Sequence, residues 1–130
     1  MKKKTILIIE DDLSILDDLD LLLQLEGYNT EKARNGLEGI HKLNTMNSPC
    51  VILLDLMMPI MDGWQFLEYC KNLGSSFQHP ILVMTALSEK FLPSKVQGQI
   101  KKPFDIADIL NSIKQHCQAS GRPSSGRPNT

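Results

Sequence analysis

Acidic side chains stand at the ends of two short hydrophobic runs in this chain. Glu10 and Asp11 come directly after TILII, and Asp55 closes VILLD. If the two runs are neighbouring parallel strands, their carboxyl ends meet at one edge of the sheet, and the carboxylates come together. Grouped carboxylates repel one another unless some stay protonated or a cation joins them. Their hard oxygen ligands suit Mg²⁺, so the sequence predicts a magnesium site.

A hydroxyl and an amine follow two later apolar segments. Thr85 ends ILVMT, and Lys102 stands directly before Pro103. At the same edge of a sheet, Mg²⁺ and Lys102 would neutralise the oxygens of a phosphoryl group, and Thr85 would donate a hydrogen bond to it. A carboxylate between a metal ion and a lysine can itself be the nucleophile. We therefore predict an aspartyl phosphate on Asp55.

Short aliphatic runs alternate along the chain with segments of helical period, a pattern typical of βαβ units. Right-handed connections leave the doubly wound order 2-1-3-4-5 as the simplest topology. We predict an α/β, flavodoxin-like fold with a five-stranded parallel sheet and a ligand site between strands 1 and 3. Strands are expected at 5–9, 28–33, 50–54, 81–85 and, weakly, 99–101, and helices at 13–26, 37–46, 63–73 and 106–117.

Helix boundaries have their own signals. Asp62 and Asp105 are placed as N-caps, and Gly27 as a C-terminal stop. Asp12 either starts the first helix or borders the acidic site, and the helix start is the favoured alternative. Pro93 interrupts 87–98, so a fourth helix there is expected to be shortened or irregular.

Bulk composition narrows the class of protein. The chain has 14 basic and 15 acidic residues and a net charge of −1, which argues against direct nucleic-acid binding and against attraction to a membrane surface. No apolar run approaches the roughly 18–20 residues of a membrane span, and the apolar run after the basic start is too short for a signal peptide. Residues 1–117 are expected to form the domain, and the polar residues 118–130 a disordered tail or linker remnant.

The cysteines give a further expectation about the compartment. Cys50, Cys70 and Cys117 are odd in number, widely spaced and without a C-x-x-C motif. This pattern indicates neither a disulfide framework nor a zinc knuckle, and it favours a reducing, cytoplasmic setting.

Four segments, IIEDD, VILLDLMMPIMDG, VMTA and KKPF, occur in this order. Together they resemble the response-regulator receiver domains of bacterial two-component signalling, of the chemotaxis-regulator kind, over about residues 4–117. The resemblance implies that Asp55 is the phosphoacceptor, that Asp11 binds Mg²⁺ directly, and that Glu10 acts through water or holds the site open. It also implies that the main-chain carbonyl of Met57 is a metal ligand.

The remaining roles also come from the resemblance. Thr85 would follow the phosphoryl group after modification, and Lys102 would pair with it. The resemblance further implies that the peptide bond between Lys102 and Pro103 is cis.

The chain departs from the family in three places. The interval between Thr85 and Lys102 is shorter than is usual, which again predicts a reshaped fourth helix. Gln99 stands where receivers usually carry a switch aromatic, so an aromatic rotamer switch cannot operate there. Met57 and Leu87 are apolar where a side chain could orient water on the phosphoryl group, which predicts slow dephosphorylation.

The favoured function is a phosphoacceptor receiver that takes its phosphoryl group from a histidine kinase or phosphotransfer protein and then switches binding to an unknown output protein. One alternative is a degenerate receiver that acts as a phosphorylation-independent interaction module. Another is a phosphatase of the haloacid-dehalogenase type, although Met57 stands where that class wants a second acid.

Several questions stay open from sequence alone. Leu21 and Leu25 lie off the core face of the first helix, and either ordinary partial burial or a kinase-docking role would explain them. Phosphorylation-dependent dimerisation is a further alternative. The chain is either a stand-alone receiver or a fragment of a larger regulator.

Overall fold

The computed structural model describes residues 4–87 and 96–121, with side chains as far as Cys117. Five parallel strands form one sheet in the order β2-β1-β3-β4-β5, which confirms the predicted topology. The strands are β1 Thr5–Ile9, β2 Asn29–Ala33, β3 Val51–Asp55, β4 Ile81–Thr85 and β5 Gly98–Lys101. The helices are α1 Leu13–Leu25, α2 Gly36–Thr45, α3 Gly63–Asn72 and α4 Ile106–Gly121, with a 3₁₀ turn, η1, at Gly74–Ser76.

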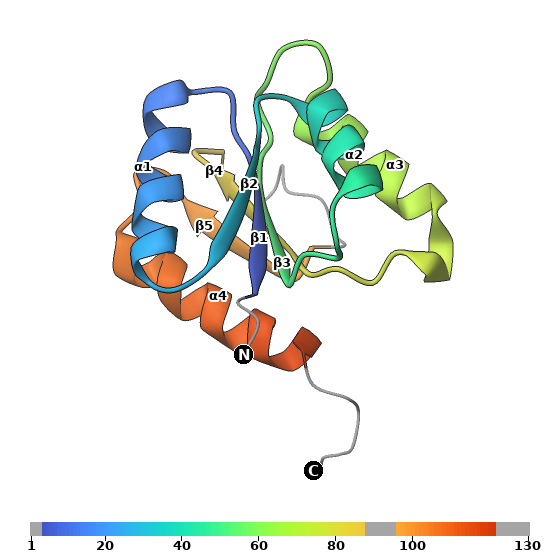
Figure 1. The fold of residues 1–130 in the computed structure, drawn as a ribbon. Helices are drawn as coiled ribbons and strands as arrows, with labels where there is room; N and C mark the ends of the chain where they lie inside the picture. The colour runs from blue at the N-terminus through green and yellow to red at the C-terminus, as the bar shows by residue number, and fades with distance from the viewer. Residues whose placement is uncertain (1–3, 88–95, 122–130) are drawn as a thin grey trace.

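Helices cover both faces of the sheet (Figure 1). On one face, α1 and α4 bury a stripe that includes Leu19, Leu23 and Ile113 against the even-numbered side chains of β1. On the other face, Phe66 of α3 packs among residues of β1, β3 and β4. The three central strands are therefore apolar on both sides, which explains the unbroken runs in their sequences.

Local signals place the ends of the helices. The Asp12 side chain accepts hydrogen bonds from the backbone of Ser14 and Ile15 and caps α1, so the helix-start interpretation is confirmed. Asp62 caps α3 and forms a reciprocal capping box with Gln65. The predicted cap is confirmed, and the box ties the loop after β3 to the helix that follows.

The C-terminal helix extends beyond the predicted boundary at residue 117. It continues to Gly121, so the first part of the segment expected as a polar tail is helical. Residues 122–130 lie outside the described residues. The shortened or irregular fourth helix was expected within 87–98, and residues 88–95 of that segment likewise lie outside the described residues.

A disulfide joins Cys50, directly before β3, to Cys117 on α4. The expectation that the cysteines form no disulfide was therefore wrong. The two residues lie 67 positions apart in sequence, and only the packing of α4 on the sheet brings their Cα atoms within 4.9 Å. Cys70 is a buried free thiol on the opposite face. The cysteine pattern consequently gives no support to a reducing compartment.

None of the helices in the described part of the chain has the length and apolar character that crossing a membrane requires.

Candidate functional site

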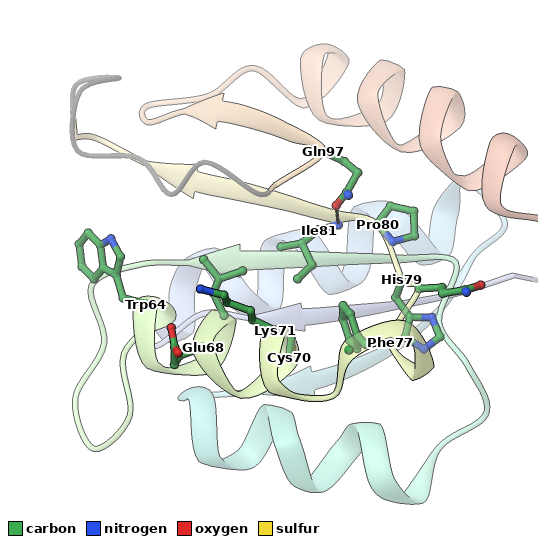
Figure 2. Close-up of a pocket in the computed structure, with 12 residues that line it drawn as sticks. Trp64, Glu68, Cys70, Lys71, Phe77, His79, Pro80, Ile81 and Gln97 are labelled. Carbon is green, nitrogen blue, oxygen red and sulfur yellow. Dashed lines mark hydrogen bonds between the residues drawn. The ribbon is translucent and has the colours of Figure 1, made fainter.

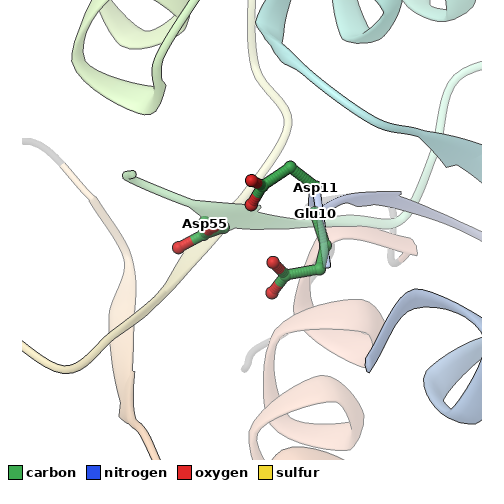
Figure 3. A group of neighbouring side chains, drawn as sticks. All are labelled: Glu10, Asp11 and Asp55. Carbon is green, nitrogen blue, oxygen red and sulfur yellow. The ribbon is translucent and has the colours of Figure 1, made fainter. Parts of the chain in front are cut away.

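Three carboxylates meet at the carboxyl ends of β1 and β3. One oxygen from each of Glu10, Asp11 and Asp55 lies within 4.8 Å of the others. Glu10 is fully buried, Asp55 is 5% exposed, and Asp11 is exposed. Figure 3 shows the three side chains gathered beyond the strand ends. The predicted convergence of the strand-end acids is therefore present.

The backbone around β1 explains why Glu10 can be buried. Its N–H donates to the carbonyl of Ala33 at 3.0 Å and so continues the ladder with β2. Its carboxylate accepts a hydrogen bond from the Asp12 N–H at 3.2 Å. The Asp12 side chain turns to the helix instead, so the three consecutive acids divide into two site residues and one cap.

Lys102 extends into the same cluster from the end of β5. Its Nζ lies 2.7 Å from an oxygen of Glu10 and 3.5 Å from an oxygen of Asp55. The peptide bond between Lys102 and Pro103 is cis, as the resemblance implied. One ammonium therefore contacts two buried carboxylates from different strands.

Thr85 and Met57 complete the set of predicted residues. Thr85 ends β4, is almost fully buried, and its Oγ1 accepts a hydrogen bond from the Leu87 N–H at 3.0 Å. The Met57 N–H lies 3.4 Å from an oxygen of Asp55, and its side chain points into solvent with 61% of the residue exposed. Both residues lie at the same edge of the sheet as the carboxylates.

Burial and two neighbouring charges together set the pKa of Asp55. Burial raises the pKa of Asp55 to about 7, the negative charge of Glu10 adds to the rise, and the ammonium of Lys102 opposes it. At Lys102, burial acts to lower the pKa, but the hydrogen bond and charge of Glu10, together with Asp55, outweigh it and raise the pKa above its usual value. A divalent cation would favour the ionised form of Asp55, as Lys102 does.

The donor set fits Mg²⁺. It consists of carboxylate oxygens on three side chains, two of them buried, whose mutual repulsion a divalent cation would relieve. No other group of three or more such ligands occurs among the residues that the structure describes. His41, His79 and His116 belong to no such cluster within that part of the chain.

Sequence reasoning missed the role of Gly63. A Cβ at this position would lie 2.6 Å from the carbonyl oxygen of Asp55 and 2.7 Å from the Cα of Leu56. The glycine thus lets the beginning of α3 pack directly on the backbone of the phosphoacceptor candidate. The only signal for this contact was its place directly after Asp62.

A separate cavity of about 710 Å³ lies between α3 and the beginning of β4 (Figure 2). Its described lining includes Trp64, Lys71 and Phe77 but none of the clustered acids. Trp64 of α3 therefore lines a cavity, whereas Phe66, two residues further along the same helix, is a core residue.

Comparisons with known proteins show the family and the fold of the chain. A model of the response regulator receiver domain matches residues 6–114. The chain is 33% identical over 129 residues to the transcriptional regulatory protein CpxR homolog of Haemophilus influenzae, covering 95% of this chain and 55% of that protein. It is 33% identical over 121 residues to sporulation initiation phosphotransferase F of Bacillus subtilis, covering 89% and 95%.

Solved structures show the same fold. The receiver domain of the Francisella response regulator 1452 superposes with a TM-score of 0.83 at 25% identity, covering 91% of this chain and 99% of that one. A CheY-like receiver domain protein from Methanospirillum hungatei gives 0.81 at 29% identity, covering 92% and 97%.

The fold and the strand-end site define a doubly wound signalling module. The chain belongs to the response regulator receiver domain family of two-component systems. Receiver domains of this family bind Mg²⁺ in general and interact with histidine kinases. The chain spans about half the length of the CpxR homolog and of other curated regulators that it matches.

Proposed function

We propose that this chain accepts a phosphoryl group on Asp55, with Mg²⁺, from a histidine kinase or a histidine phosphotransfer protein, and thereby switches its binding to an output protein. The observation that carries the proposal is the position of Lys102, whose ammonium contacts both Glu10 and Asp55 beside a cluster of three carboxylates. With Mg²⁺ held by the carboxylates, the ion and Lys102 would supply the positive charge that a transferred phosphoryl group requires.

In the proposed reaction, a carboxylate oxygen of Asp55 attacks phosphorus while the bond from phosphorus to the donor's imidazole nitrogen breaks. The electron pair of that bond leaves with the imidazole. Lys102 lies close enough to Asp55 to neutralise charge on the phosphoryl oxygens, and the Thr85 hydroxyl would turn from Leu87 to donate to one of them. When bound, Mg²⁺ supplies further neutralisation of those oxygens, and Glu10, Asp11, Asp55 and the Met57 carbonyl would hold it.

Exposed apolar side chains around the acids support a protein as the donor. Leu13 follows β1 and is 53% exposed, whereas Met57 and Ile60 follow β3 and are 61% and 77% exposed. Leu21 and Leu25 are also exposed on α1, so a docking role for them stays a proposal. In this proposal the chain is a phosphoacceptor rather than an enzyme that turns over a substrate. It makes no direct contacts to nucleic acid or membrane, and it acts in the cytoplasm.

One observation favours a second candidate. Gln99 lies on β5, paired with Val83, in the position where receivers usually carry a switch aromatic. A receiver without that switch could act as an interaction module that does not depend on phosphorylation.

A small phosphodonor with Mg²⁺, followed by intact-mass measurement, distinguishes the two candidates. We expect wild type to gain one phosphoryl group, ~80 Da, and Asp55→Asn to gain none. Asp12→Asn is the matched control. Asp12 follows the acidic cluster in sequence, and an asparagine there can still cap α1, so this variant should be modified as wild type is. An unmodified wild type would favour the interaction module.

A further inference from the structure

The disulfide between Cys50 and Cys117 lies at the opposite edge of the sheet from the acidic cluster. Cys50 directly precedes β3, whereas Asp55 ends it, so the two sites are separated by the length of the strand, about 16 Å. No residue of the phosphoryl site takes part in the cross-link. Whatever the disulfide does is therefore separate from the proposed phosphoryl chemistry.

Two independently held elements bring the cysteines together. The Cys50 N–H donates to the carbonyl of Thr5 at 2.9 Å, which ties the residue to the beginning of β1. Cys117 continues the buried stripe of Ile109 and Ile113 on α4 and is only 2% exposed. Their Cα separation of 4.9 Å is within the usual range of protein disulfides, so the bond is compatible with the packing of α4 on the sheet.

The surroundings of the two sulfur-bearing residues differ. Cys50 is partly exposed, whereas Cys117 is buried on the face of α4 that packs in the core. A small thiol or disulfide can therefore reach the pair from the side of Cys50. The third cysteine offers an internal contrast, because burial raises the pKa of the Cys70 thiol to about 12, which makes its reactive thiolate scarce.

We propose that Cys50 and Cys117 form a reversible redox latch, in which oxidation ties the C-terminal end of α4 to the beginning of β3 and reduction releases it. Cys117 is the last described buried residue of α4, so the bond covalently secures the end of the helix that leads to residue 121. This inference rests on the cytoplasmic setting proposed above, where disulfides are typically transient and redox-sensing. The latch does not depend on phosphorylation of Asp55.

The oxidant is a low-molecular-weight disulfide such as oxidised glutathione. The Cys50 thiolate attacks one of its sulfurs, the sulfur–sulfur bond breaks, and one small thiol leaves. The Cys117 thiolate then attacks the Cys50 sulfur of the mixed disulfide and releases the second small thiol. Two protein thiols and one small disulfide thus become one protein disulfide and two small thiols, and reduction is the reverse.

The test equilibrates the full chain in a series of reduced-to-oxidised glutathione ratios, quenches it with acid, and alkylates it after denaturation. Intact mass then counts free thiols. We expect three alkylated cysteines at the reducing end, one at the oxidising end, and both species at intermediate ratios. Three at every ratio, one at every ratio, or only glutathione adducts would overturn the latch.

A second measurement follows the helix. Oxidised wild type should have a midpoint of thermal unfolding higher than the reduced protein by on the order of 10 °C, and slower amide exchange in the last turns of α4. Cys70→Ser should keep both differences, and Cys50→Ala, at the partly exposed position, should lose both. The latch is wrong if Cys50→Ala retains the redox dependence or if wild type shows none.

Discussion

A single ammonium between two buried carboxylates dominates the site at the scale of residues. Glu10 and Asp55 are almost completely inaccessible, and Lys102 is the cation that contacts both among the described ion pairs. Buried charges that lose their partner are costly, because neither water nor another ion replaces it. Loss of the contacts that we propose prepare Asp55 for phosphoryl transfer should therefore destabilise the protein.

Replacing Lys102 with Met should lower the free energy of unfolding at pH 8 by about 3 kcal/mol, because it leaves Glu10 buried without its cation. Urea unfolding at low Mg²⁺ measures the difference. The neighbouring Lys101→Met is the control, since Lys101 is exposed and should cost less than about 1 kcal/mol. Equal losses in the two variants would contradict the role assigned to Lys102.

Dephosphorylation should be slow, because neither Met57 nor Leu87 can orient water on the phosphoryl group. Met57→Glu should accelerate it by at least about ten-fold, since a carboxylate can position and activate an attacking water. The decay of the phosphorylated mass over time measures the rate. Ile60→Glu, in the same exposed loop, is expected to leave the rate unchanged. A wild-type half-life of only seconds would refute the prediction.

At the scale of elements, the loop from β3 to α3 positions Asp55, the proposed phosphoacceptor. The capping box of Asp62 and Gln65 begins α3, and the Gly63 N–H donates to the carbonyl of Leu56 at 2.9 Å. The beginning of the helix thus packs against the backbone that carries Asp55. A substitution that disturbs this packing should therefore displace Asp55 directly.

Gly63→Ala should destabilise the protein by about 2 kcal/mol and slow phosphorylation of Asp55, because the added methyl group meets backbone atoms that cannot shift cheaply. Gly39→Ala is the matched control. Its methyl would meet the end of the Ile9 side chain and the ring of Phe66, which can adjust. Chemical denaturation and the rate of mass gain measure both effects, and a smaller loss at Gly63 than at Gly39 would contradict this account.

The connection before β4 should make stability depend on pH. Burial lowers the pKa of His79, while a hydrogen bond with the backbone of Pro49 opposes the change. The unfolded chain therefore binds the proton of His79 more readily, so the contribution of His79 to stability should fall as pH drops through about 6.5 and below. The raised pKa of Asp55 acts in the opposite direction over the same range.

His79→Gln should remove this contribution, so the stability of the variant should fall less, or rise more, than that of wild type as pH is lowered. Because His79 is only partly buried, its contribution to the free energy of unfolding should change by less than about 1 kcal/mol between pH 7 and pH 5. Thermal unfolding across that range compares the variant with wild type, and an identical slope in both would rule out His79 as its source.

At the scale of the whole molecule, the two edges of the sheet carry different chemistry. The carboxyl edge gathers the acids and Lys102, whereas the opposite edge carries the disulfide between Cys50 and Cys117. The buried layers between them hold both in place. Binding of Mg²⁺ at the carboxyl edge should therefore raise the stability of the entire domain.

Mg²⁺ should raise the free energy of unfolding by about 1.4 kcal/mol at ten times its dissociation constant. Thermal unfolding with Mg²⁺ and then with a chelator measures this. Asp11→Asn should abolish the response, whereas Asp12→Asn, at the helix cap, should keep it. A response that survives in Asp11→Asn would place the ion elsewhere.

Much of this fold could be read from local patterns. The strand runs, the leucine spacing of α1 and the aspartate caps are properties of a few consecutive residues, and the structure reproduces them within about one residue except at the end of α4. The parallel topology then follows from connection rules, so the meeting of Glu10, Asp11 and Asp55 could be predicted before any coordinates.

Other features depend on residues far apart in sequence. By itself the sequence determined which side chains end the strands, because the strands follow from the local hydrophobic pattern, and it determined the strand order through the rules for connections between parallel strands. Only the tertiary structure decided that Lys102 pairs with Glu10 as well as Asp55, that Gly63 packs on the Asp55 backbone, and that Cys50 bonds Cys117. These contacts require elements packed to within a few ångströms of one another, and no local pattern encodes that packing.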